Sequence, residues 1–451
     1  MSAGAEQAPN AMSADGVGRD QALAVPPWTF KAHSVLAAVT FFNGFDTLAV
    51  AAIVPAIASL WKLAPSQLGV LIAAGLAGRL AGGILFGWIA DRCGRLTALT
   101  GSTAIFAGLS FACAFAWNYE TLLVLHAIQG VGLGGQLPVA TVYSSEIAQP
   151  RTRGRDVLLH LIAFPVGVAA AVAAGIWIVP SIGWQYVLVI GAIPAMLVLF
   201  LRRLLPESPA WLPPARRDDA GAAAIHTAAA EAPGDATETT SEQPAAGAYD
   251  AWWRDFFDPR YGQRSLIVWV IWLSAFLLTY AFAIWIPTLF RTVFGVSPGV
   301  AAQYGLIIQV AGLLGVLGGA FTIDRLGRRL SFSISFAAAA FVLFTLWLQW
   351  PGSIGYVLVL TIAGYFFTAF IATGVYAYTA ELYPARTRAL ATGVAAAWLP
   401  IAMMTGSLLA GMTIAEPAPV ILILGAIAAI AAVLTRILAV ETAGPLEEIS
   451  P

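Results

Sequence analysis

Long apolar runs follow one another from Ala32 almost to the end of this 451-residue chain, and most are about 20 residues long. A helix of that length crosses the roughly 30 Å hydrocarbon core of a bilayer. The runs are continuous rather than alternating, which excludes a transmembrane β-barrel. Charged residues make up only 10% of the chain, against about a quarter in soluble domains. The sequence therefore predicts an all-α polytopic protein embedded in a lipid bilayer.

We expect twelve transmembrane helices, divided six and six by a long polar connection. The predicted spans are 32–60, 66–91, 97–117, 121–146, 156–180, 183–203, 265–291, 299–323, 330–350, 353–383, 389–412 and 418–440. They define a tail at 1–31, an N-terminal half at 32–203, a central loop at 204–264, a C-terminal half at 265–440 and a tail at 441–451.

The middle of the central loop, 214–250, consists mainly of Ala, Gly, Thr, Glu and Pro and cannot bury a core, so we expect it to be disordered. Residues 252–257 mix Trp and Phe with Arg and Asp, a composition typical of an amphipathic segment on the membrane surface. Residues 1–28 lack the basic-then-apolar pattern of a cleaved signal and are predicted to be a disordered polar tail.

Basic residues indicate the orientation in the membrane. Lys62 and Arg291 fall in connections on one side, Arg79 falls inside a span, and the other Lys and Arg residues lie in the tails or on the opposite side. The positive-inside rule then places both termini and the central loop in the cytoplasm, with the spans in the plasma (inner) membrane.

Two unrelated motifs each occur twice at nearly the same spacing. GWIADRCGR (87–95) returns as FTIDRLGRR (321–329), and SEIAQPRTRG (145–154) returns as AELYPARTRA (380–389). The aspartates of the first motif are 233 residues apart and the glutamates of the second are 235 apart. A period shared by two motifs indicates an internal duplication, so we expect two pseudo-symmetric six-helix halves.

These features together resemble the major facilitator superfamily over nearly the whole chain. GxxxDRxGR follows the second and eighth spans, and GFDT (44–47) and PESPAWL (206–212) resemble the branch that contains sugar porters and aromatic-acid:proton symporters. The resemblance implies a carrier that moves one small solute by rocking its halves about a site near the membrane midplane.

The chain also departs from the patterns of particular family branches. The span at 265–291 lacks the Gln-rich, Asn-containing motif of sugar porters, and ETAGPLEE (441–448) matches their tail only in part. The span at 156–180 lacks the repeated-Gly motif of drug/proton antiporters. His126 stands where the family usually has an Arg at the start of its RxxQG motif.

The duplicated motifs supply candidate gate residues at the cytoplasmic helix ends. Asp91 can accept hydrogen bonds from a facing helix N-terminus, whose amides and dipole favour an anion. The resemblance suggests the span at 389–412 as that partner, which would make Asp91 a latch. Alternatively, Asp91 and Arg92 only anchor the topology through their charge, and Asp324 is purely structural. The candidate gate residues are Gly87, Asp91, Arg92, Arg95, Glu146, Asp324, Arg325, Arg328, Glu381 and Arg386.

Asp46 is the one carboxylate deep inside a predicted span, and ionisable residues in a membrane interior are functional candidates by default. It is therefore the candidate proton carrier, with an aspartate bonded to broken backbone beside Gly44 as the alternative. Arg79 is the deep cation at about the same depth on the neighbouring span. It could pair with Asp46, bind a substrate carboxylate or alternate between the two, and a purely structural ion pair is the remaining possibility.

His126 shares a helix face with Gln129 and Gln136. It is a second candidate for proton coupling because histidine titrates near neutral pH, although an interfacial hydrogen-bonding role is the alternative. The resemblance implies that the first, fourth, seventh and tenth spans line a cavity, where aromatic side chains predominate and packing is the alternative role. The candidate substrate-binding residues are Arg79, Gln129, Gln136, Tyr280, Trp285, Tyr365 and Tyr376, with Phe45 and Thr368 beside them.

The sequence favours a proton-coupled symporter for a small organic solute, with an aromatic or other organic acid as the expected cargo. A sugar or polyol porter, a proton-coupled exporter and a non-transporting sensor are the alternatives, and measured flux would exclude the last. There is no GxxxxGK[ST] motif, metal cluster or nucleophile–base pair, so we expect no cofactor and no enzymatic activity. The expected partners are the solute, protons and lipid, with no nucleic acid, and the protein is expected to be monomeric.

Overall fold

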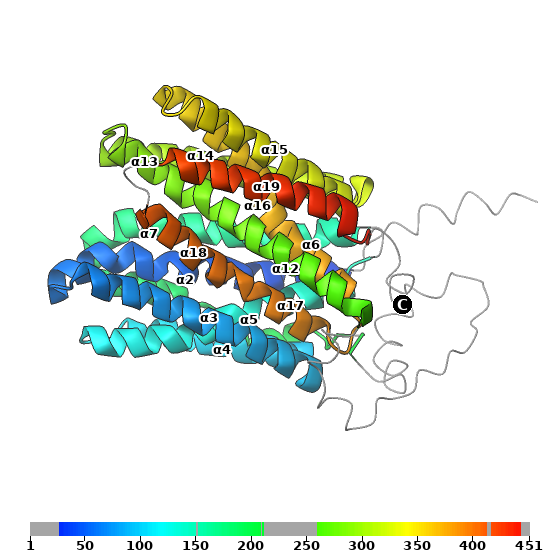
Figure 1. Cartoon of the computed structure of the whole chain (residues 1–451). Helices are drawn as coiled ribbons and strands as arrows, with labels where there is room; N and C mark the ends of the chain where they lie inside the picture. Colours follow the sequence, from blue (N-terminus) through cyan, green and yellow to red (C-terminus); the bar gives the residue numbers. More distant parts are fainter. Residues whose placement is uncertain (1–26, 150–151, 209, 212–258, 413–415, 443–451) are drawn as a thin grey trace, which may run out of the picture.

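The structure is a computed structural model that describes residues 27–149, 152–208, 210–211, 259–412 and 416–442. The described part is entirely helical, and its two halves lie side by side, the N-terminal half in blue to teal and the C-terminal half in green to red (Figure 1). The predicted disorder at 214–250, the predicted surface segment at 252–257 and most of both predicted tails lie outside the described residues.

The N-terminal half comprises α2 (Pro27–Trp61), α3 (Pro65–Cys93), α4 (Arg95–Cys113), α5 (Tyr119–Ile147), α6 (Arg153–Leu161), α7 (Ala163–Ile182), α8 (Gln185–Gly191) and α9 (Pro194–Leu204). The C-terminal half comprises α12 (Pro259–Tyr280), the π-helical segment η1 (Ala281–Trp285), α13 (Ile286–Thr292), α14 (Pro298–Leu326), α15 (Arg328–Leu348), α16 (Ile354–Leu382), α17 (Arg388–Ala396), α18 (Trp398–Met412) and α19 (Ala418–Leu438).

Eleven helices in the described chain, some of them made of successive segments, are long and apolar enough to cross a membrane. The remaining predicted span, 183–203, is present as the short helices α8 and α9, which include an apolar stretch at Gln185–Val198. The prediction of an all-α polytopic fold is therefore confirmed, with the sixth span divided in two.

Four predicted spans are interrupted rather than continuous, and each interruption lies shortly before a proline. Proline lacks an amide proton and crowds the carbonyl four residues earlier, so the preceding turn loses a hydrogen bond. Proline alone is not sufficient, because Pro55, Pro138 and Pro180 lie inside unbroken helices. Helix α6 ends at Leu161, before Pro165, and α8 ends at Gly191, before Pro194. The π-helical segment η1 precedes Pro287, and α17 ends at Ala396, before Pro400.

The two halves meet mainly through α3 with α17 and α6 with α14. Both pairs lie at the end of the bundle that carries the duplicated motifs, which we call the motif end. At Gly83 and Gly393 the backbones of α3 and α17 touch, since a Cβ on Gly393 would lie 2.0 Å from the Gly83 carbonyl oxygen. Small residues permit such close helix contacts in membranes. The motif end is thus closed in this structure.

Candidate functional site

Asp91 joins the first copy of the duplicated motif to the opposite half. Its Oδ1 accepts a hydrogen bond from the Ala389 amide at 3.1 Å, and its Oδ2 accepts one from the Leu390 amide at 2.7 Å, at the start of α17. Gly87 makes room for this approach, because a Cβ there would lie 2.6 Å from the Ala389 carbonyl oxygen. The carboxylate satisfies free amides and interacts favourably with the helix dipole. The helix-terminus contact predicted for Asp91 is present.

Asp324, in the second copy, makes the equivalent contact in the opposite direction. Its carboxylate accepts hydrogen bonds from the Gly154 amide at 3.2 Å and the Arg155 amide at 2.9 Å, at the start of α6. The Asp324 side chain is 17% exposed, whereas that of Asp91 is 7% exposed. Each half therefore holds a helix N-terminus of the other half, with the Asp91 contact the more buried.

Glu146 gathers arginines from both halves at the motif end. Its Oε1 lies 3.0 Å from Arg95 Nη2 and 3.0 Å from Arg388 Nη1, with the carboxylate fully buried. The Ser208 hydroxyl donates to its other oxygen. Arg95 also forms an ion pair with Asp91 at 3.0 Å. Because Arg388 belongs to α17, Glu146 connects the two halves by a buried ion pair.

Glu381 is the counterpart of Glu146 in the C-terminal half. Its Oε1 lies 2.8 Å from Arg328 Nη2, and the Thr442 hydroxyl donates to its other oxygen. Arg328 also forms an ion pair with Asp324 at 2.8 Å. These hydrogen-bonding partners lie in the C-terminal half, and buried Arg153 of the N-terminal half interacts with Glu381 electrostatically without forming an ion pair at contact distance.

Three predicted gate residues, Arg92, Arg325 and Arg386, are exposed. The Arg92 guanidinium lies over the Trp88 ring, 5.3 Å from its centroid, and neither Arg92 nor Arg325 forms an ion pair with a described residue. Arg388 was not predicted as a gate residue, although it is the second arginine of the duplicated RTR sequence. That repeat was the available signal.

Asp46 lies inside the N-terminal half and is fully buried. Its Oδ1 lies at hydrogen-bonding distance from the Ser110 hydroxyl oxygen of α4, 2.9 Å away, while Oδ2 has no hydrogen-bond partner among the described residues. Gly191 of α8 packs directly against it, since a Cβ there would lie 1.8 Å from Oδ1. Asp46 and Arg79 are not ion-paired in this structure.

Arg79 points instead to the seam between the halves. Its guanidinium donates to the Thr47 hydroxyl, which belongs to the residue that follows Asp46 on α2. Tyr376 of α16, in the opposite half, and His126 of α5 are both close enough to interact with it electrostatically. Arg79 is buried without a carboxylate partner among the described residues, an arrangement that leaves its charge available to an anionic ligand.

A row of buried amides lies beside Arg79 on α2 and α5. His126 Nδ1 lies 3.0 Å from Gln129 Oε1, Gln136 reaches Thr40, and Asn43 donates to the Leu133 carbonyl. His126 is buried inside the helix bundle, and its ring fits against Gly75. The polar atoms Asn43 Oδ1, Gln129 Nε2 and Gln136 Oε1 have no partner among the described residues. Buried polar atoms without partners are candidates for ligand contacts.

The C-terminal half contributes aromatic rings to this region. Tyr376 packs edge-on against Trp272 of α12 with ring centroids 4.4 Å apart. The ring centroids of Phe276 and Tyr376 are 6.3 Å apart. Tyr365, also predicted to bind substrate, is buried with its ring against Gly312 of α14. Apolar rings on one side and a cation on the other can hold an aromatic ring that bears a carboxylate.

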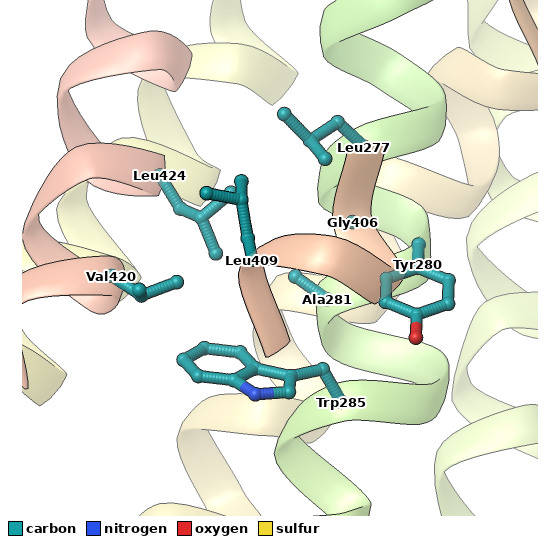
Figure 2. A pocket seen from close by; sticks show the side chains of 8 residues that line it. All are labelled: Leu277, Tyr280, Ala281, Trp285, Gly406, Leu409, Val420 and Leu424. Carbon is teal, nitrogen blue, oxygen red and sulfur yellow. The ribbon is translucent and has the colours of Figure 1, made fainter. Parts of the chain in front are cut away.

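Tyr280 and Trp285 lie in a different place from the other predicted substrate residues. They line an apolar pocket inside the C-terminal half, at the π-helical segment and against α18 and α19 (Figure 2). The Trp285 indole nitrogen is buried without a described partner. The remaining lining residues are Leu277, Ala281, Gly406, Leu409, Val420 and Leu424. None of them comes from the N-terminal half.

Residues 33–451 match the sequence profile of the family described as sugar (and other) transporter. The chain belongs to this family. It is 31% identical over 359 residues to the niacin transporter NiaP of Acinetobacter baylyi, covering 79% of this chain and 80% of that protein. It is 32% identical over 289 residues to the 4-hydroxybenzoate transporter PcaK of Pseudomonas putida, covering 64% of each.

The fold also matches that of a solved member of the major facilitator superfamily. The proton:xylose symporter XylE, bound to 6-bromo-6-deoxy-D-glucose, superposes with a TM-score of 0.77 over 94% of this chain and 98% of that chain, at 21% identity. The predicted superfamily and fold are confirmed. The chain is therefore an integral membrane transporter of small solutes rather than an enzyme.

Proposed function

We propose that this protein is a proton-coupled symporter of an aromatic carboxylic acid. The observation that carries the proposal is Arg79, a buried cation at the seam that has no carboxylate partner in the described part of the chain and lies opposite Tyr376 and the rings beside it. A carboxylate is the anion that a guanidinium binds with two parallel hydrogen bonds. The names of the relatives NiaP and PcaK point to the same class, since niacin and 4-hydroxybenzoate are both aromatic carboxylic acids.

Each half would bind a different part of the solute. Arg79 would bind the carboxylate, and the unpartnered amides of Gln129 and Gln136 would bind polar ring substituents. Trp272 and Tyr376 would hold the ring face. Because binding draws on both halves, it would stabilise the states in which the halves are close, as alternating access about a midplane site requires.

Asp46 would carry the proton, with His126 as the second candidate. An ionised Asp46 places a negative charge on the residue next to Thr47, to which Arg79 is bonded. Protonation removes that charge, so a solute carboxylate becomes the counter-ion available to Arg79. By reciprocal linkage, solute binding then favours the protonated acid, and the proton and anion travel together.

A sugar or polyol porter is the second candidate. The fully buried amides of Gln129 and Gln136 favour it, because amides with free polar atoms are suited to hydroxyl groups. The buried charge of Arg79 favours the acid.

We also propose that the motif end is cytoplasmic and that the protein works as a monomer in the plasma (inner) membrane. Asp324, Glu146 and most of the arginines lie at that end, in accordance with the positive-inside rule. Reporter fusions at Ala64, Trp117 and Ser297 should report an outside location and fusions within 214–250 an inside location. An inside signal at Trp117 would overturn this orientation.

Uptake into liposomes tests the proposed function. With an acidic exterior, the purified protein should accumulate labelled nicotinate or 4-hydroxybenzoate above the level set by diffusion, and should not accumulate xylose. Asp46→Asn should lose accumulation but keep exchange of solute, because the amide mimics the protonated acid. Asp156→Asn, at the start of α6, is the matched control and should keep accumulation. Accumulation of xylose would favour the second candidate, and wild-type uptake that ignores the pH gradient would reject proton coupling.

A further inference from the structure

Ser110 sits between two oxygen atoms at hydrogen-bonding distance. Its Oγ lies 2.9 Å from Asp46 Oδ1 and 3.0 Å from the Leu188 carbonyl oxygen. All three groups are in the membrane interior, on α2, α4 and α8, and both Asp46 and Ser110 are fully buried. Gly191 of α8 packs directly against the Asp46 and Ser110 side chains. A Cβ at Gly191 would lie 1.8 Å from Asp46 Oδ1 and 2.6 Å from Ser110 Oγ.

A single proton cannot give both of these oxygen–oxygen contacts a linear hydrogen bond, whereas two protons can. The Ser110 hydroxyl supplies one proton and can accept another through its lone pairs. A protonated Asp46 supplies the second: its carboxyl O–H donates to Ser110, and Ser110 donates to Leu188. The Leu188 carbonyl has a lone pair for this bond in addition to the one that accepts from the Ala192 amide. Two such contacts are the arrangement expected of the proton-loaded carrier.

When the proton leaves, only one of these contacts can keep a hydrogen bond. The ionised carboxylate is an acceptor only, so the Ser110 hydroxyl must turn from Leu188 to Asp46. Asp46 makes no ion pair with any described residue, and a buried charge without donors is strongly unfavourable. The ionisable and strongly polar groups around the carboxylate are Cys113 of α4, Gln129 of α5 with its partner His126, Arg79 of α3 by way of Thr47, and the exposed Tyr186 of α8, with none on α7.

We propose that Ser110 is the positioning residue for the transported proton: its hydroxyl accepts from protonated Asp46 while bonded to Leu188, and rotates to donate to Asp46 when the proton is released. This inference rests on the proposed proton-coupled function. The rotation supplies the new anion with a hydrogen bond at the moment of release. It also breaks the link from α4 to α8, next to the interruption between α8 and α9, so that proton release loosens this corner of the N-terminal half.

The proposal predicts a change in the pH profile of Ser110→Ala. A hydrogen bond to a charged group stabilises more than one between neutral groups, so losing the hydroxyl destabilises ionised Asp46 more than the protonated form. The pH of half-maximal uptake should therefore rise by about one unit, which corresponds to a roughly tenfold higher proton affinity. Exchange of solute at low pH should stay near the wild-type rate.

Three further variants make the test specific. Ser110→Cys should shift the profile in the same direction by less, because a thiol is a weak donor. Ser102→Ala is the matched control, because Ser102 is equally buried on α4 but donates to its own helix at Leu99. Ser110→Ala in an Asp46→Asn background should leave the pH dependence of exchange as it is in Asp46→Asn alone.

An unchanged or downward-shifted profile in Ser110→Ala, with wild-type uptake still driven by the pH gradient, would overturn this inference and leave the proposed function standing. An equal shift in Ser102→Ala would also overturn it, since the effect would then belong to helix packing. If wild-type uptake does not depend on the pH gradient, the proposed function fails first, and the inference fails with it.

Discussion

The two halves of this transporter are alike at the motif end and unlike in the membrane interior. At the motif end, Asp91 and Asp324 each bind the N-terminus of a helix in the other half, and Glu146 and Glu381 each bind a buried arginine of their own half. In the interior, the described N-terminal half carries Asp46, Arg79 and His126, while the described C-terminal half has no ionisable residue other than tyrosine away from its helix ends.

This difference reflects the different structural requirements of gating and of solute binding. Closing one side of the bundle requires matching contacts on both halves, and an internal duplication supplies them in pairs. Recognising an anion and moving a proton requires charges in one place, and burying further ionisable groups in the membrane would be unfavourable. We infer that the halves kept the duplicated contacts for gating and diverged where the solute binds.

Removing the buried glutamates should have the largest effect and should distinguish the two copies of the network. Glu146→Ala removes an ion-pair partner from both Arg95 and Arg388, whereas Glu381→Ala removes an ion pair from Arg328 alone and a longer-range attraction for Arg153. Breaking a buried ion pair from one side typically costs about 3–5 kcal/mol. Thermal unfolding in detergent should show a lower Tm for both variants, and a larger loss for Glu146→Ala. Equal losses would contradict the linking role of Arg388.

Neutralising the two aspartates should have a moderate effect on the gate. Asp91→Asn and Asp324→Asn each weaken hydrogen bonds to a charged group, worth roughly 1.5–3 kcal/mol, which corresponds to about a tenfold or larger shift between conformations. Transport in liposomes should slow in both while expression stays intact, and more in Asp91→Asn because Asp91 is the more buried. Normal turnover of Asp91→Asn would favour a role in topology alone.

Changing the aromatic side of the interior should have a smaller, solute-specific effect. Phe276→Leu keeps an apolar side chain but removes a ring beside Trp272 and Tyr376. Aromatic pairs contribute about 0.5–1.5 kcal/mol beyond burial, so binding of benzoate-type acids should weaken about two- to tenfold. Binding of cyclohexanecarboxylate should not change. Phe344→Leu, a half-buried ring against Gly425, is the matched control, and a similar loss in it would point to general packing.

The exposed arginines of the motif should have the smallest effect. Arg92→Ala and Arg325→Ala remove charges that make no ion pair with a described residue, so stability should change by no more than about 0.5 kcal/mol. Transport rates measured beside those of the aspartate variants should be near wild type. A tenfold loss in either arginine variant would place it in the gate.

The sequence predicted the membrane fold and two similar halves from hydrophobicity and spacing, and it predicted that Asp91 binds a helix N-terminus, while the family resemblance suggested which helix. The sequence did not predict the helix interruptions. A proline leaves one backbone carbonyl without its helical hydrogen bond, and whether the helix breaks there depends on the groups packed around that carbonyl. Pro165 and Pro400 follow breaks, whereas Pro138 lies in an unbroken helix.

Depth along a helix can be counted from the sequence, but direction around the helix cannot. Asp46 and Arg79 were expected at one depth, and the bond from Arg79 to Thr47 agrees with that. Asp46, however, turns towards Ser110, which stands in an otherwise ordinary apolar span and carries no sequence signal of its own. Tyr280 and Trp285 were expected in the solute cavity, but they line a different pocket.

The most direct test of the account is the binding of a matched pair of ligands to Arg79→Gln. In the wild type, an aromatic acid such as 4-hydroxybenzoate should bind more tightly than its neutral amide, and more tightly at low pH as long as the acid stays ionised. In Arg79→Gln, the acid should lose about tenfold or more in affinity, as expected for a charge-assisted contact, while the amide binds as before. Equal loss of both ligands, or tight binding of a hexose with weak binding of the acid, would contradict the claim that Arg79 binds a carboxylate.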